Sequence, residues 1–164
     1  MLKNWLVAYT KPRHEKKSAE VLKSSGVDVF LPLQKQLKVW SDRKKWVESP
    51  LFPGYLFVNI SDDDYFKVLN SYGIVKYIFF NQKPAVVKDD VIDSIQKLMS
   101  DEINSCVEIK DIELIIGEEF CINKGPLKGL KGKLLNFKGK NKIAIEIECM
   151  KKAVLVEVDK SFLT

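Results

Sequence analysis

The stretch from Glu48 to Ile60, Glu-Ser-Pro-Leu-Phe-Pro-Gly-Tyr-Leu-Phe-Val-Asn-Ile, decides the fold. It holds no charged side chain after Glu48. Pro53 fixes its own φ and Gly54 accepts a positive φ, so this pair predicts a turn. The aromatic and β-branched run that follows, residues 55–58, is short and apolar, which predicts a central strand buried on both faces.

The composition is that of a soluble globular protein. Of the 164 residues, 46% are hydrophobic and 30% are charged, which is an ordinary balance. No uncharged apolar run approaches the roughly 18 residues that a membrane span requires. The chain enters a strand-like segment directly, without the hydrophobic region of a signal peptide. We therefore expect a cytoplasmic protein with no membrane partner.

The net charge of +5 is unevenly distributed. Residues 1–48 hold eleven Lys and Arg against five Asp and Glu, residues 49–112 hold six against ten, and residues 113–164 hold ten against seven. A basic N-terminal third favours binding to nucleic acid or to an acidic protein face. Solvated surface lysines are the alternative explanation.

The basic residues begin in the first predicted helix. Residues 5–9 predict a strand, Thr10 predicts an N-cap, and the helix should then run to about Ser25 and end at Gly26. Its start carries four cations, Lys11, Arg13, Lys16 and Lys17. Cations oppose the macrodipole at a helix N-terminus, so this arrangement suggests a phosphate partner. A solvated helix end is the competing interpretation.

A hairpin is predicted next. The apolar alternation of residues 28–40 predicts a half-buried strand, and Pro32 pushes it toward a sheet edge or a bulge. Residues 41–45 form the basic tip, and the return strand begins at Trp46. We assign Arg43, Lys44 and Lys45 to a contact with nucleic acid or a protein partner. The rings of Trp40 and Trp46 are expected to staple the two strands, although stacking on nucleic acid is the alternative.

The remainder of the N-terminal half predicts an α+β sandwich. A helix begins at Ser61, which caps an acidic first turn, and ends at Gly73. A dense apolar strand follows over residues 74–80, then a short extended piece over 84–87 and a third helix over 88–99. A sheet face that helices leave partly uncovered would be a partner site.

The sequence pattern of the C-terminal half differs from that of the N-terminal half. Residues 101–112 mix charges with little periodicity and are assigned to a linker. Residues 113–164 carry short predicted strands at 119–122, 130–137, 143–149 and 153–158, a spacing that predicts a small antiparallel barrel. The segment Gly125-Pro-Leu-Lys-Gly-Leu-Lys-Gly132 lacks the Gly-Lys-Ser/Thr of a phosphate loop.

Several of these stretches resemble the NusG family of transcription elongation factors. Residues 52–58, Phe-Pro-Gly-Tyr-Leu-Phe-Val, look like the hallmark of the family's N-terminal (NGN) domain, and residues 5–17 resemble its opening strand and first helix. Residues 40–51 resemble the specialised branch of RfaH-like and UpxY-like antiterminators. Gly125 to Gly132 looks like a KOW motif of an SH3-like barrel. The resemblance implies an NGN-like domain over 1–100 and a KOW-like domain over 113–164.

The resemblance also implies partners. An NGN domain docks on the β′ clamp helices of bacterial RNA polymerase through an apolar patch, and matching the motif places Tyr55, Phe57 and Phe52 there. We add Phe80 from its position at the end of its strand. Bridging the clamp would oppose its opening and disfavour pausing. The nucleic-acid face, toward non-template DNA or nascent RNA, would comprise Lys11, Arg13, His14, Lys16, Lys17, Arg43, Lys44 and Lys45.

The KOW-like domain would recruit a second partner, such as a ribosomal protein or the termination factor Rho, or would contact RNA. Its loop comprises Gly125, Lys128, Gly129, Lys131 and Gly132. A monomer is expected. The alternative function is that of a KOW-containing RNA-binding or ribosome-associated protein, for which the N-terminal aromatic strand would be only core.

The sequence does not indicate an enzyme. His14 is the one histidine and lies in the basic helix start without a nearby Ser or Cys partner. The three cysteines, Cys106, Cys121 and Cys149, form no Cys-x-x-Cys pair, which argues against a zinc site. We expect neither a metal nor a cofactor.

Overall fold

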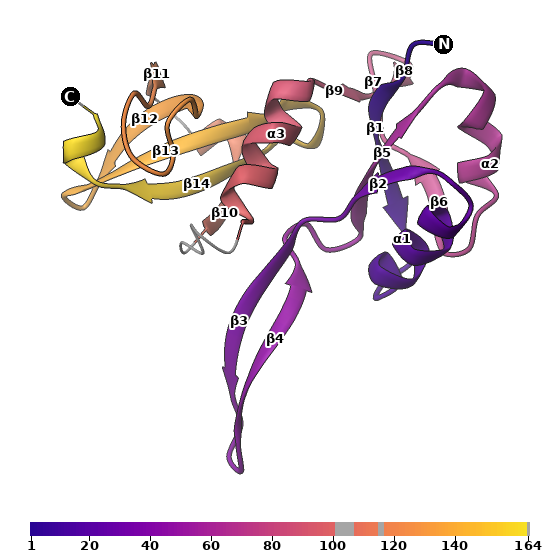
Figure 1. Ribbon diagram of the computed structural model, residues 1–164, viewed down its shortest axis with the longest axis horizontal. Helices are drawn as coiled ribbons and strands as arrows, with labels where there is room; N and C mark the ends of the chain where they lie inside the picture. Colours follow the sequence, from indigo (N-terminus) through magenta and orange to yellow (C-terminus); the bar gives the residue numbers. More distant parts are fainter. Residues whose placement is uncertain (101–106, 115–116, 164) are drawn as a thin grey trace. The chain divides into compact units, whose positions relative to one another are not determined.

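The computed structural model describes residues 1–100, 107–114 and 117–163. These residues divide into two compact units, Met1–Val87 and Lys88–Thr164. Each unit has its own antiparallel sheet (Figure 1).

The first unit is built around a five-stranded sheet with the order β2-β5-β1-β6, in which β9 also pairs with β1. Every pairing in it is antiparallel. Leu56, Phe57 and Val58 of β5 are fully buried, so the predicted central strand, buried on both faces, is confirmed. The strands are β1 (Asn4–Thr10), β2 (Asp28–Phe30), β5 (Tyr55–Ile60), β6 (Ile74–Tyr77) and β9 (Val86–Val87).

Two helices cover one face of this sheet. They are α1 (Glu15–Ser24) and α2 (Tyr65–Leu69), the latter preceded by the 3-10 helix η1 (Asp62–Asp64). Leu22 of α1 and Val68 of α2 are fully buried and join one apolar cluster with residues of β1 and β5. Burial of a Leu or Val side chain contributes about 1.5–3 kcal/mol, so this cluster is the main source of stability on this face.

Residues 28–40 do not form the single half-buried strand that the sequence predicted. After β2, the buried Pro32 interrupts the ladder, and β3 (Leu33–Val39) pairs with β4 (Lys44–Pro50) in a separate two-stranded sheet. Proline cannot donate a ladder hydrogen bond, and its carbonyl accepts instead from the N–H of Leu51 at 2.8 Å. Figure 1 shows this hairpin running away from the sheet of its own unit. The apolar alternation therefore lies on an exposed ribbon.

The predicted strand over 74–80 is also divided. Beyond β6, the short strand β7 (Phe79–Phe80) pairs with β8 (Lys83–Pro84) in another two-stranded sheet. The turn between them places Asn81 at φ 50° and Gln82 at φ 64°, the backbone of a type I′ hairpin turn. Such turns usually contain glycine, and its absence here hid the hairpin in the sequence.

The predicted N-cap at Thr10 is wrong, whereas Ser61 is an N-cap residue as predicted, before the acidic first turn of η1. Helix α1 begins at Glu15 with His14 as its N-cap, well after Thr10. Arg13 has a φ of 63°, a left-handed conformation that a helix cannot contain. Ser61 precedes η1 but makes no side-chain capping bond. The predicted end of α1 at Gly26 is confirmed, because this residue has a φ of 84°.

The second unit carries a five-stranded antiparallel sheet with the order β10-β14-β13-β12-β11. All four strands predicted in this half form, with ends moved by a few residues, and the C-terminal all-β domain is confirmed. Ile143, Ile145 and Ile147 are buried, as their alternation predicted. The strands are β10 (Val107–Asp111), β11 (Glu118–Cys121), β12 (Lys131–Phe137), β13 (Lys140–Ile147) and β14 (Lys152–Val158). Its described residues also include the 3-10 helices η2 (Ile112–Leu114), η3 (Glu148–Met150) and η4 (Lys160–Phe162).

The predicted third helix is α3 (Asp89–Leu98), which packs its apolar face within the second unit. The predicted domain boundary at residue 100 remains a prediction. Residues 107–111, which the sequence assigned to a linker, form strand β10 and pair with β14. A charge of this segment is also paired across the sheet, since Lys142 Nζ donates to Glu108 Oε1 at 2.9 Å. Residues 101–106 of the predicted linker lie outside the described residues.

Candidate polymerase and nucleic-acid interface

The Pro53–Gly54 turn is fixed by two segments distant in sequence. The Gly54 N–H donates to the Glu15 carboxylate at 2.7 Å, and the Gly54 carbonyl accepts from the N–H of Thr10 at 2.8 Å. Gly54 has a φ of 85°, and a Cβ there would lie 3.2 Å from the ring of Tyr9. The turn therefore holds together the start of α1, the end of β1 and the beginning of β5. Sequence reasoning missed Glu15, because nothing in the local sequence pattern indicates that this side chain is buried.

Aromatic rings line the sheet face opposite the two helices. Tyr9 and Tyr55 are cross-strand partners whose ring centroids lie 5.3 Å apart. Two positions further along β5, the ring centroid of Phe57 lies 5.9 Å from that of Phe30 and 6.0 Å from that of Phe52. Phe52 and Phe57 are buried, whereas Tyr9, Tyr55 and Phe30 are half-buried and leave part of this aromatic face accessible.

The structure separates the four aromatic residues predicted to bind polymerase. Phe57 and Phe52 are core residues with exposed fractions of 0% and 3%. Tyr55 offers part of its ring, and Phe80 is 48% exposed but belongs to β7, in a different sheet. Direct contact with a partner is therefore open to Tyr55 and Phe80, whereas Phe52 and Phe57 belong to the core beside the turn.

The predicted cations at the start of α1 are all exposed: Lys11, Arg13, Lys16 and Lys17. Lys16 Nζ donates to the Glu48 carbonyl at 2.9 Å, which ties the helix to the base of the β3–β4 hairpin. His14 is half-buried; its Nδ1 donates to the Pro12 carbonyl at 2.8 Å and its ring lies 5.5 Å from that of Tyr72. Its contacts give it a structural role in the turn before α1.

The hairpin register sorts its side chains onto two faces, because cross-strand partners share a face and successive residues alternate. Lys38 lies directly opposite Lys45. Trp40 and Arg43, two pairs further along and joined by the Trp40 N–H to the Arg43 carbonyl at 2.8 Å, share their face. The Arg43 guanidinium lies 5.6 Å from the Trp40 ring centroid. We call these four residues the basic face. Sequence reasoning missed Lys38 because it lies outside the charge run at the tip.

The opposite face of the hairpin is largely apolar. Leu37 pairs with Trp46, and Val39 pairs with Lys44. The predicted trio Arg43, Lys44 and Lys45 is thus divided, with Lys44 on the apolar face. The two tryptophans lie on different faces, and each has a partner on the opposite strand, as a staple requires: Trp46 pairs with Leu37, and the Trp40 ring lies beside Arg43.

The KOW-like loop is held by its own backbone. The Gly129 N–H donates to the Ile122 carbonyl at 2.7 Å, and the Ile122 N–H donates to the Leu130 carbonyl at 2.9 Å. Gly125 and Gly129 both have positive φ, and at Gly132 a Cβ would lie 2.4 Å from a β13 carbonyl. The glycines therefore shape the loop. Lys128 and Lys131 are exposed and remain the candidates for a contact.

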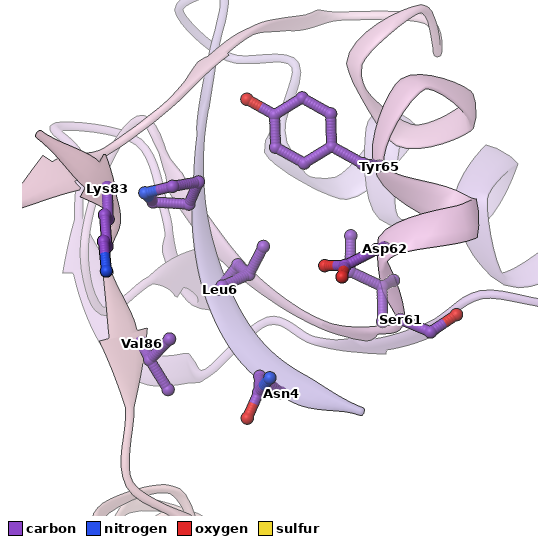
Figure 2. A pocket seen from close by; sticks show the side chains of 9 residues that line it. Asn4, Leu6, Ser61, Asp62, Tyr65, Lys83 and Val86 are labelled. Carbon is purple, nitrogen blue, oxygen red and sulfur yellow. The ribbon is translucent and has the colours of Figure 1, made fainter. Parts of the chain in front are cut away.

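A half-open pocket of about 220 Å³ lies at the other end of β1 (Figure 2). Leu6 lies at its centre, Asp62 faces it from η1, and Lys83 lies across from Asp62 on β8. Its remaining lining residues are Asn4, Ile60, Ser61, Tyr65, Pro84 and Val86. No sequence pattern indicates it, since its walls come from segments far apart in the chain. One lining residue, Tyr65, accepts a hydrogen bond on its carbonyl from the Tyr77 hydroxyl at 2.9 Å, and burial raises the pKa of Tyr77.

Within the described residues, no cluster of His, Cys, Asp or Glu could hold a metal ion. Cys121 and Cys149 are free thiols, and burial raises the pKa of Cys149; Cys106 lies outside the described residues. No helix in the described part of the chain is long and apolar enough to cross a bilayer.

A model of the family described as transcription termination factor NusG matches residues 3–96, more than half of the chain. The chain belongs to the NusG family. Two curated relatives, from Halalkalibacterium halodurans and Bacillus subtilis, are each 25% identical over 97% of this chain and 96% of their own. Both are named transcription termination/antitermination protein NusG. The predicted resemblance is confirmed, and the chain is a transcription termination/antitermination factor of the NusG type.

A solved structure shows the same fold. The study titled "Domain interaction in Thermotoga maritima NusG" describes a chain that matches 98% of this one over 95% of its own length, with 21% identity and a TM-score of 0.55. The family's model ends at residue 96 and so includes most of α3 (Asp89–Leu98), whereas compactness groups this helix with the second unit.

Proposed function

We propose that this protein binds the clamp helices of bacterial RNA polymerase through Tyr55 and reduces pausing and termination. The observation that carries the proposal is the half-buried Tyr9–Tyr55 pair, whose ring centroids lie 5.3 Å apart, directly after a turn that the Glu15–Gly54 hydrogen bond holds in place. A preorganised aromatic anchor provides contact area at little entropic cost. Bridging the clamp would change the populations of its open and closed states, without bond chemistry.

The hairpin and the start of α1 support a specialised, operon-specific role. The basic face contains cations beside an exposed aromatic ring, which is the combination that binds single-stranded nucleic acid. Non-template DNA and nascent RNA are the two candidates. The KOW-like domain would recruit a ribosomal protein, Rho or RNA through Lys128 and Lys131. The site of action would then be the cytoplasm.

The second candidate function is that of an RNA-binding or ribosome-associated protein, and the basic face of the hairpin is the feature that favours it. Phosphate binding weakens steeply with salt, by about 0.7–0.9 units of log affinity per neutralised phosphate for each unit of log salt. Binding to polymerase through an apolar contact should instead persist as the salt concentration rises. Salt dependence therefore distinguishes the two.

The test is co-purification of core RNA polymerase with the tagged protein at moderate salt. Tyr55→Ala should lose the polymerase, whereas Phe66→Ala, which removes a 67% exposed ring from α2, should retain it. Phe57 is unsuitable for the test because its replacement would open the core. If the wild type retains no polymerase but binds RNA in a salt-sensitive way, the RNA-binding function replaces this one.

A further inference from the structure

The apolar face of the hairpin has no function in the proposal so far. Leu37, Val39 and Trp46 are 47%, 64% and 64% exposed, and the register places them side by side on one face. Seven residues of strand extend about 23 Å, and Figure 1 shows the hairpin extending away from the sheet of its unit. We call these three residues the apolar strip.

Two of the three residues of the strip argue against nucleic acid as its occupant, although the Trp46 ring by itself could stack on a base. Leu37 and Val39 are aliphatic, and they can neither stack as a ring does nor donate a hydrogen bond to a base edge. On the opposite face, by contrast, Lys38 and Lys45 lie directly across from each other. Like charges in that position are destabilising, so they are better explained by a phosphate that neutralises them. The two faces are therefore suited to different partners.

The area of the strip argues against a second copy of this chain. Three side chains expose on the order of a few hundred Å². Two strips packed face to face would bury far less than the ~1,200 Å² of a stable, specific interface. A patch of this size contributes useful affinity only when another contact already holds the partner nearby.

We infer that the apolar strip is a second docking surface for RNA polymerase, distinct from the Tyr55 site. The inference rests on the proposed function, because polymerase held at Tyr55 supplies the high effective concentration that a small strip needs. Two lysines share the face of the strip: Lys35 lies opposite Glu48, whereas Lys44 lies opposite the apolar Val39. A partner surface that fits this face would therefore be an apolar recess with a carboxylate at its edge, beside Lys44. Trp46 is the central anchor, as tryptophan often is in interfaces.

The first test measures the affinity of the full chain for a purified elongation complex, assembled from core RNA polymerase on a DNA–RNA scaffold. Trp46→Ala should weaken binding roughly ten- to thirty-fold, and the loss should persist at high salt because the contact is apolar. Phe66→Ala is the matched control. Replacement of Trp46 leaves the core intact, since 64% of its surface is exposed.

The second test uses a photo-crosslinking residue at position 39 or 38 in the same complex. Position 39 should crosslink to a polymerase subunit, and position 38, on the basic face, should crosslink to nucleic acid. If Trp46→Ala binds as tightly as wild type while Tyr55→Ala does not bind, the second dock is refuted and the proposed function stands. If position 39 crosslinks to nucleic acid, the assignment of the faces is refuted. If wild type fails to bind the complex, the proposed function fails first.

Discussion

The Glu15 carboxylate accepts a hydrogen bond from the Gly54 N–H at 2.7 Å, across 39 residues of sequence. Glu15 is only 7% exposed, and it lies in the first turn of α1, where an acidic side chain suits the positive end of the helix. One carboxylate thereby joins the helix that carries the basic residues to the turn that presents Tyr55. The two candidate surfaces of the first unit are held in a fixed relation by this bond.

Replacing Glu15 should destabilise the first unit. Glu15→Ala leaves the Gly54 N–H without its charged acceptor, and we expect a loss of about 1.5–3 kcal/mol in the free energy of unfolding, measured by urea denaturation. Glu15→Gln keeps an acceptor and should cost less. Glu20→Ala is the control on the same helix, because Glu20 is exposed and lies 3.9 Å from Lys17; it should change stability by under about 1 kcal/mol. If Glu15→Ala and Glu20→Ala lowered the free energy of unfolding equally, the Glu15–Gly54 hydrogen bond would not stabilise the first unit.

Gly54 and Gly26 form a matched pair for testing the turn. Their φ values are 85° and 84°, but a Cβ would meet the Tyr9 ring at 3.2 Å at Gly54 and nothing within 4 Å at Gly26. Both alanine variants should lose about 1–2 kcal/mol from the left-handed backbone. Gly54→Ala should also displace Tyr9 and so weaken polymerase binding, whereas Gly26→Ala should not. A polymerase affinity lowered equally in the two variants would show that the ring contact is unimportant.

Most of the sheet and core could be predicted from sequence, because apolar periodicity reports burial directly. Residues 55–58 and the alternating isoleucines of β13 carry that signal. The same rule failed at residues 33–39, where Leu37 and Val39 alternate as in a half-buried strand but are exposed. Alternation shows that a strand has two unlike faces, and it does not show whether the apolar face meets the core of its own chain.

The motif named residue types, but their exposure depends on the fold. Tyr55 is half-buried, whereas Phe57 is buried among Phe30 and Phe52, which only the fold brings together. The charge run at 43–45 could not show that Lys44 faces away from Lys45, because that depends on the register with β3. Glu15 and Lys38 were missed for the same reason: their partners are distant in sequence.

The two faces of the hairpin predict different salt dependence for two neighbouring lysines. Lys45→Gln removes a cation from the basic face, so the slope of log affinity for single-stranded nucleic acid against log salt should fall by about 0.7. The variant should also relieve the repulsion with Lys38, a stabilisation of about 0.2–1 kcal/mol. Lys44→Gln, on the apolar face, should leave the slope unchanged. The slope is measured by fluorescence anisotropy over a salt series, and equal slopes for the two variants would contradict the division into faces.

The second unit should show a pH dependence that one ion pair explains. The Lys142 ammonium, 2.9 Å from Glu108, holds the pKa of that carboxyl below its ordinary value of 4.5. A lowered folded-state pKa means that the unfolded chain binds more protons near that pH, so stability rises with pH. The contribution of the pair is fully present above the ordinary pKa and is lost as the pH falls through the folded value.

Lys142→Met should therefore flatten the acid limb of the stability curve, measured as the urea midpoint between about pH 6 and pH 3. Methionine can fill the space of the lysine stem, whose side chain is only 9% exposed. Lys140→Met is the matched control, because its partner Glu157 is about half exposed and the pair is screened by solvent; it should keep the acid limb of the wild type. If Lys142→Met loses stability toward low pH as steeply as the wild type, other carboxylates carry the effect, and the charges of β10 have a different role from the one assigned here.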